Sequence, residues 1–110
     1  MAAVDLSTAS ISPWVSRTAS VGTTWQAFTL PDWARAVCIT PSGAARVAFD
    51  KSGKVGDIET PADGGAVGDH YQSIAAGASF EFTRIGSLRA GTVFVASDTS
   101  TVNVCITVMA

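Results

Sequence analysis

The sequence predicts an all-β protein, a single antiparallel β-sandwich of about seven short strands behind an extended N-terminal arm. Short runs rich in β-branched and aromatic residues recur at close, regular spacing, with turn residues between them. No stretch shows the period of an amphipathic helix. At 110 residues the chain fits one domain and is too short for two independent cores. This pattern fits a jelly roll and an immunoglobulin-like sandwich equally well.

Residues 1–22 are expected to form the extended arm, and residues 23–110 the sandwich domain. The arm is dominated by Ala, Ser, Thr and Val, a composition that favours extended chain over helix. Trp14 and Val15 are its only bulky anchor. Because buried aromatic residues dominate interface energies, an arm that holds one tryptophan suits docking to a partner. The alternative is that Trp14 folds back over the protein's own core.

The body is expected to hold seven strands, in which successive side chains point to opposite faces of a sheet. In chain order they cover residues 24–30, 35–40, 45–50, 70–75, 79–84, 92–96 and 102–108. Pro31 and Pro41 end the first two, because proline cannot donate to a strand ladder. At most one helical turn is expected, at residues 32–34. The turn residues Ser42 and Gly43 predict that the second and third strands form a hairpin, and the last two are expected to pair as well.

Residues 51–69 form the most polar and glycine-rich stretch, and we expect a solvated or partner-contacting loop there. Its carboxylates raise the alternative of a calcium site, because calcium takes oxygen ligands. The carboxylates concerned are Asp50, Asp57, Glu59, Asp63 and Asp69. Their spacing matches no calcium-binding loop, and Lys51 and Lys54 lie among them.

Cys38 and Cys105 each lie in the tetrapeptide Val-Cys-Ile-Thr. Strand alternation places each cysteine on the less apolar face, beside threonine, so two small unreactive thiols are the favoured interpretation. A disulfide remains the alternative, and it requires neighbouring strands with close Cα atoms. Of the other tryptophans, Trp25 is expected in the core. Trp33 lies in a corner where it either plugs one end of the sandwich or, if exposed, offers a platform for sugar binding.

Charge and composition exclude several classes of function. Only 15% of the residues are charged, against roughly a quarter in ordinary soluble domains, so the surface is suited to being covered by other protein. The net charge of −2 and the scattered basic residues argue against nucleic-acid binding. No apolar run approaches the length of a membrane span, and the first residues lack the features of a secretory signal. We therefore expect a protein made and kept in a cytoplasm, at least until a larger particle releases it.

No catalytic motif is visible. The single histidine, His70, follows Asp69 directly, and adjacent strand residues face opposite sides, so they cannot easily form an orienting pair. The sequence has neither a nucleophile elbow nor a phosphate-binding glycine loop. We expect no cofactor, no metal and no enzymatic activity. A small metal-dependent jelly-roll enzyme is the least favoured alternative.

Two stretches resemble small β-sandwich proteins of tailed-phage virions. They are residues 25–37, with the run Leu-Pro-Asp-Trp-Ala, and residues 74–80 followed by 91–97. The likeness covers most of residues 24–108 and is nearest to the capsid decoration, or cement, proteins. It implies a jelly-roll-like domain, often trimeric, that binds and reinforces an assembled shell.

Under this resemblance the partner is the major capsid protein or another virion protein, and the chain resides in a virion assembled in the host cytoplasm. The resemblance transfers no functional residue. The candidate partner contacts, Trp14, Val15 and Trp33, come from the residues themselves. The alternative function is a head-fibre or tail-associated module that binds carbohydrate.

Overall fold

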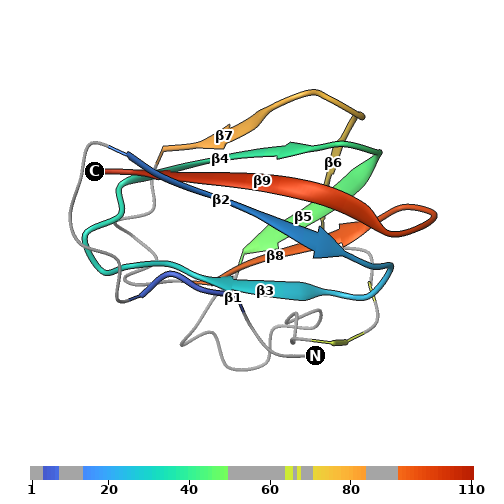
Figure 1. Ribbon diagram of the computed structural model, residues 1–110, viewed down its shortest axis with the longest axis horizontal. Coiled ribbons are helices and arrows are strands. Elements are labelled where there is room, and N and C mark those ends of the chain that lie inside the picture. Colours follow the sequence, from blue (N-terminus) through green and yellow to red (C-terminus); the bar gives the residue numbers. More distant parts are fainter. Residues whose placement is uncertain (1–3, 8–13, 50–63, 66, 68–70, 84–91) are drawn as a thin grey trace.

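The computed structural model describes residues 4–7, 14–49, 64–65, 67, 71–83 and 92–110. Over these residues the protein is all-β without a helix, and its strands form two facing sheets (Figure 1). The strands are β1 (Val4–Asp5), β2 (Trp14–Val21), β3 (Gln26–Thr29), β4 (Ala36–Pro41), β5 (Ala45–Phe49), β6 (Gln72–Ile74), β7 (Phe80–Phe82), β8 (Thr92–Ser97) and β9 (Val102–Met109). The all-β, two-sheet prediction is confirmed. Among the described residues no helix is long and apolar enough to cross a membrane.

The strands divide between a five-stranded and a four-stranded sheet. Sheet A has the order β1-β3-β8-β5-β6, and sheet B has the order β2-β9-β4-β7. All neighbours are antiparallel except β1 and β3, which run parallel. Four of the pairs are nested within one another: β2 with β9, β3 with β8, β4 with β7 and β5 with β6. The chain from β2 to β9 is therefore one long antiparallel ribbon, folded over at β5–β6 and rolled into two layers.

The described residues form nine strands rather than the expected seven. Each of the seven expected strands is present, and the two additional ones, β1 and β2, lie inside the expected arm. β2 pairs with β9 along its whole length, from Trp14 opposite Met109 to Val21 opposite Val102. The description of residues 1–22 as an arm is therefore wrong for residues 14–21, which are extended but belong to the sandwich. They do so because the inward side of β2 buries apolar groups, including the fully buried Val21.

The two expected pairings of consecutive strands are also wrong. β4 lies in sheet B and β5 in sheet A, and the same separation holds for β9 and β8. Both short connections therefore carry the chain from one sheet to the other. The two corners are joined by backbone hydrogen bonds: the Ser42 amide donates to the Asn103 carbonyl (2.8 Å), and the Asp98 amide to the Ala44 carbonyl (3.0 Å). The expected single turn at residues 32–34 is present as a hydrogen bond from the Ala34 amide to the Pro31 carbonyl (3.2 Å).

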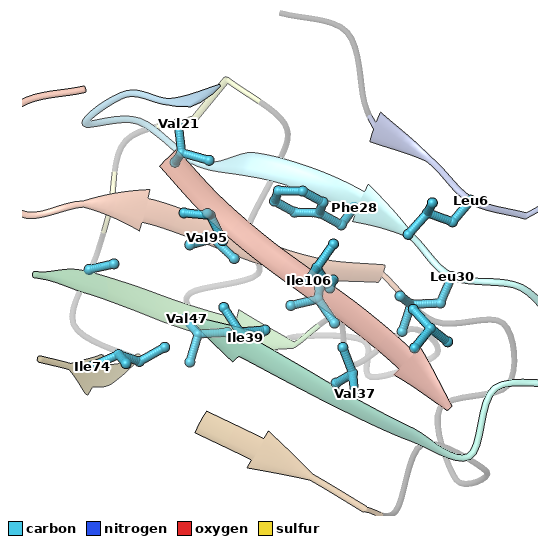
Figure 2. Packing of buried hydrophobic residues seen from close by; sticks show 14 of the residues in the cluster. Leu6, Val21, Phe28, Leu30, Val37, Ile39, Val47, Ile74, Val95 and Ile106 are labelled. Atoms are coloured by element: carbon cyan, nitrogen blue, oxygen red, sulfur yellow. The ribbon is translucent and has the colours of Figure 1, made fainter. Parts of the chain in front are cut away.

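The main hydrophobic core lies between the two sheets (Figure 2). Its largest fully buried side chains include Phe28, Leu30, Ile39 and Ile106. Leu6, just after β1, also enters this core, and its amide donates to the Thr29 carbonyl (2.8 Å). β1 therefore extends sheet A beyond β3 and contributes a core residue.

Candidate protein-interaction face

The outer face of sheet A is covered by the protein itself. A second hydrophobic cluster on this face contains Trp25, Ala27, Ala48, Phe94 and Ala96, all buried. The rings of Trp25 and Phe94 meet edge to face, with centroids 6.3 Å apart. Trp25 is thus buried as expected, but on the outside of sheet A rather than between the two sheets.

Gly64, Gly65 and Val67 lie against this side of sheet A. The Trp25 amide donates to the Gly65 carbonyl (2.9 Å), and the Gly64 amide donates to the Trp25 carbonyl (2.7 Å). Val67, which is partly buried, packs against the cluster. Gly64 has a φ of 79°, a conformation that glycine adopts without a steric penalty. The end of the predicted 51–69 loop is therefore fastened to the sheet where the structure describes it.

Charged groups also lie on this side of the molecule. Arg46 of β5 forms an ion pair with Asp98 (2.5 Å), and its guanidinium lies 4.8 Å from the centroid of the Tyr71 ring. Both ion-pair side chains are about one-third exposed, so the pair contributes little stability. The ion pair nevertheless links Asp98, in the connection between β8 and β9, to Arg46 in β5.

The outer face of sheet B is different, because its described side chains are mostly small and polar and are exposed or half-buried. The outward residues, set by alternation and register, are Trp14, Ser16, Thr18 and Ser20 of β2; Asn103, Cys105, Thr107 and Met109 of β9; Ala36, Cys38 and Thr40 of β4; and Glu81 of β7. Among them only Glu81 is charged. We call this set the B face.

Hydroxyl groups on the B face bond to one another across the strands. Ser16 Oγ lies 2.8 Å from Thr107 Oγ1 and 3.5 Å from Cys105 Sγ. Thr40 Oγ1 lies 2.8 Å from Ser79 Oγ just before β7. The two 2.8 Å contacts are hydrogen bonds, one linking β2 to β9 and the other linking β4 to the residue before β7.

Trp14 stands at one end of the B face. It is 62% exposed, the most exposed of the large hydrophobic side chains in the described residues. Its neighbours across the strands are Met109, directly opposite, and Ala36, which pairs with Met109 from the other side. Trp14, Met109 and Ala36 therefore form an apolar row at this end of the B face, whose other residues are polar.

The three candidate contact residues lie in different environments in the structure. Trp14 points outward on the B face, whereas Val15 pairs with Val108 on the core-facing side of β2 and is half-buried. Trp33 is partly buried and packs against the main core, as expected for a ring that plugs the sandwich end. A contact role for these residues stays a prediction, and Trp14 is the one whose exposure suits it.

The cysteine environments agree with the alternation argument. β4 and β9 are neighbours, Cys38 lies opposite Thr107, and Cys105 lies opposite Thr40. The two cysteines are therefore diagonal rather than directly opposite each other, and both are free thiols that are half-exposed. The B face as a whole was missed in the sequence. The alternation of Ser and Thr with apolar residues in 14–21 and 102–109 was the signal that could have found it.

His70 and the carboxylates considered for calcium lie outside the described residues. Within the described part of the chain, no group of three or more His, Cys, Asp or Glu side chains could hold a metal ion. The carboxylate of Asp5 accepts hydrogen bonds from the side chain of Ser7 and from the Ser7 amide, which lies 2.8 Å from Oδ1. Together they lower the pKa of this exposed group below its ordinary value.

Comparison with known proteins identifies no relative, so a functional proposal has to rest on the fold and the B face. No family model matches the chain, and neither a curated protein nor a solved structure matches it.

Proposed function

We propose that this chain is a non-enzymatic structural protein of a virion, a capsid decoration protein that binds and stabilises the assembled shell. The observation that carries the proposal is the exposed Trp14, fixed on an eight-residue strand at the apolar end of the B face. Aromatic anchors of this kind dominate the free energy of protein–protein interfaces. A face with one charged side chain also binds another protein without desolvating many charges.

The strand order supports the finer fold assignment. An order of 2-9-4-7 in one sheet and 3-8-5-6 in the other is that of a jelly roll, to which β1 adds an extra edge strand. Jelly rolls occur in viral capsid proteins and also in lectins and cupins. Our proposal favours the first group because Trp14 is exposed on the B face, and because the described residues hold no group of three metal-ligating side chains.

The mechanism follows from mass action. A protein that binds the assembled shell but not the free subunits stabilises the shell by its binding free energy. The resemblance to decoration proteins implies a trimer, and several weak contacts per oligomer then add up through effective concentration. In this proposal Trp14 supplies one such contact from each copy.

Binding to shells tests the proposal. Shells are assembled from the major capsid protein encoded in the same genome, without this chain, and the purified protein is added and co-sedimented. We expect saturable binding, weakened about 30-fold by Trp14→Ser, since a buried aromatic anchor contributes roughly 2 kcal/mol.

The matched control is Tyr71→Ser, which removes the other large exposed aromatic residue, on the sheet A side, and should bind as the wild type does. A point substitution is required, because deleting residues 1–22 would remove β2 from the sheet. Absence of wild-type binding would refute the proposed function. Equal binding by Trp14→Ser would refute the role of Trp14.

A further inference from the structure

Sheet B has one long edge strand. Of the four strands at the edges of the described sheets, three are short: β1 has two residues, and β6 and β7 have three each. The fourth, β2, has eight residues, all paired with β9 on one side (Figure 1). Natural proteins shorten, charge or cover such edges, because unpaired backbone groups bond readily to another chain. β2 contains neither proline nor lysine, and Arg17 is its one charged residue. It is therefore the described edge best suited to accept a further strand.

Hydrogen bonds of β9 on its β4 side show how the backbone of β9 is oriented. The Ser42 amide donates to the Asn103 carbonyl (2.8 Å), and the Asn103 amide donates to Ser42 Oγ (3.0 Å). The Met109 carbonyl accepts from the Arg35 amide (2.9 Å). Asn103 and Met109 therefore direct backbone groups away from β2. Because this direction alternates along an antiparallel strand, the β9 residues that bond to the β2 backbone are Val102, Val104, Ile106 and Val108.

The same alternation leaves part of the β2 backbone unpaired. Ser16, Thr18 and Ser20 lie opposite the other residues of β9, so their N–H and C=O groups point away from β9. Within the described part of the chain, no hydrogen bond reaches these backbone groups from the open side of β2. All three residues are exposed. The edge therefore offers three donors and three acceptors at the spacing that an added strand requires.

Trp14 connects this edge with the proposed function. It begins the same strand and is the residue to which we assign shell binding. A strand added beside β2 would present alternate side chains on the outer side of sheet B, next to the B face. One extended partner segment could therefore use the backbone edge and Trp14 together. In strand addition of this kind the main-chain hydrogen bonds supply affinity, and contacts with neighbouring side chains supply specificity.

From these observations we propose that an extended segment of the shell protein binds as a fifth strand of sheet B, on the edge formed by Ser16, Thr18 and Ser20. The inference rests on the proposed function and adds the mode of binding to it. The competing occupant is the β2 edge of a second copy of this chain, and the experiment separates the two.

The test variant is Thr18→Pro, which removes the central amide of the open edge. The bonds between β2 and β9 do not use this amide, and proline occurs in edge strands where the N–H faces solvent. Thr18→Ala is the matched control, because it removes the same side chain and keeps the amide. Both variants and the wild type are compared by thermal unfolding and by light scattering. They are then co-sedimented with the shells described above.

We expect Thr18→Ala to bind shells as the wild type does. Thr18→Pro should bind at least about 10-fold more weakly, because a hydrogen bond is lost at the centre of the added strand. Hydrogen exchange of the wild type gives a second measurement that decides the matter even if Thr18→Pro fails to fold. In the free chain the amides of Ser16 and Thr18 should exchange quickly and those of Arg17 and Ala19 slowly, and shell binding should protect Ser16 and Thr18.

Equal shell binding by Thr18→Pro and Thr18→Ala overturns the inference and leaves the proposed function intact. Fast exchange of the Ser16 and Thr18 amides in the shell-bound chain does the same. A free wild-type dimer that Thr18→Pro dissociates would assign the edge to a second copy and would also overturn the inference. Absence of wild-type binding to shells would refute the proposed function itself.

Discussion

Replacing Gly43 by alanine perturbs the corner at which the chain passes from β4 to β5. A Cβ atom at this position would lie 2.6 Å from Val102 Cγ1 and 3.6 Å from Val102 Cβ. The optimal separation of two carbon atoms is about 3.5–4.0 Å, so one of the groups must move. Val102 opens β9 and is partly buried against the main core. Its branched side chain is stiff at χ1 and cannot rotate away without cost.

The expected magnitude combines two opposing effects. Overpacking of this kind lowers the free energy of unfolding by about 1–3 kcal/mol. Alanine also restricts the unfolded chain, which returns about 0.4–1 kcal/mol. Gly43 is not among the described glycines with positive φ, so backbone strain adds nothing. We therefore expect a net destabilisation of about 1–2 kcal/mol, and a melting temperature lowered by roughly 4–8 °C.

Urea unfolding at equilibrium measures this change, with Gly22→Ala as the control. No atom lies within 4 Å of a Cβ built at Gly22, so this variant should be neutral or up to about 1 kcal/mol more stable. Combining Gly43→Ala with Val102→Ala should give a coupling energy above about 0.5 kcal/mol, because the second change removes the clashing methyl group. Equal stability of the two glycine variants, or additive effects in the double variant, would refute the reasoning.

Two further predictions concern the covered side of the molecule and its N-terminal strand. Val67→Asp should place a charge against the second hydrophobic cluster and loosen the contacts of Gly64, Gly65 and Val67, at a cost of roughly 1–3 kcal/mol. Amide hydrogen exchange at Trp25, whose amide is bonded to Gly65, should then become faster than in Val67→Ala. Equal exchange rates in the two variants would contradict the role of these residues as a cover. The pKa of Asp5 should lie below its ordinary value in an NMR titration, because its carboxylate accepts hydrogen bonds from the side chain and from the amide of Ser7. A lowered folded-state pKa means that this contribution to stability is present above the unfolded pKa and is lost as pH falls through the folded one. An ordinary or raised pKa for Asp5 would count against this hydrogen bond.

The positions of the strands in the body could be predicted from local sequence, because β-branched and aromatic residues mark strands wherever they pair. The pairing of those strands could not. Ser42-Gly43 has the turn chemistry of a hairpin, yet here it makes a corner between sheets, held by the hydrogen bond from Ser42 to Asn103. Hairpins and corners share turn residues, and long-range packing decides between them. β2 was missed as a sheet strand because its outward Ser and Thr residues dilute the apolar signal of its inward side.

The candidate site was predictable only as separate pieces. Alternation placed each cysteine with threonine on one face, and the structure agrees. The contact between the two Val-Cys-Ile-Thr segments depends on the pairing of β4 with β9, which no local pattern encodes. Whether Trp14 is exposed likewise depends on β2 docking onto β9 with its first residue facing outward.

The structure shows where charged side chains are scarce among the described residues. On the sheet A side, Val67 packs against the apolar cluster, and Arg46 forms an ion pair with Asp98. On the sheet B side, the hydroxyl and thiol groups of the B face are exposed or half-buried, and Glu81 is the one charged residue among its described outward side chains. Within the described residues, the two outer sheet faces therefore differ in how far the chain itself covers them. The exposed Trp14 and the single charged outward residue of sheet B are what support the proposal that another protein docks there.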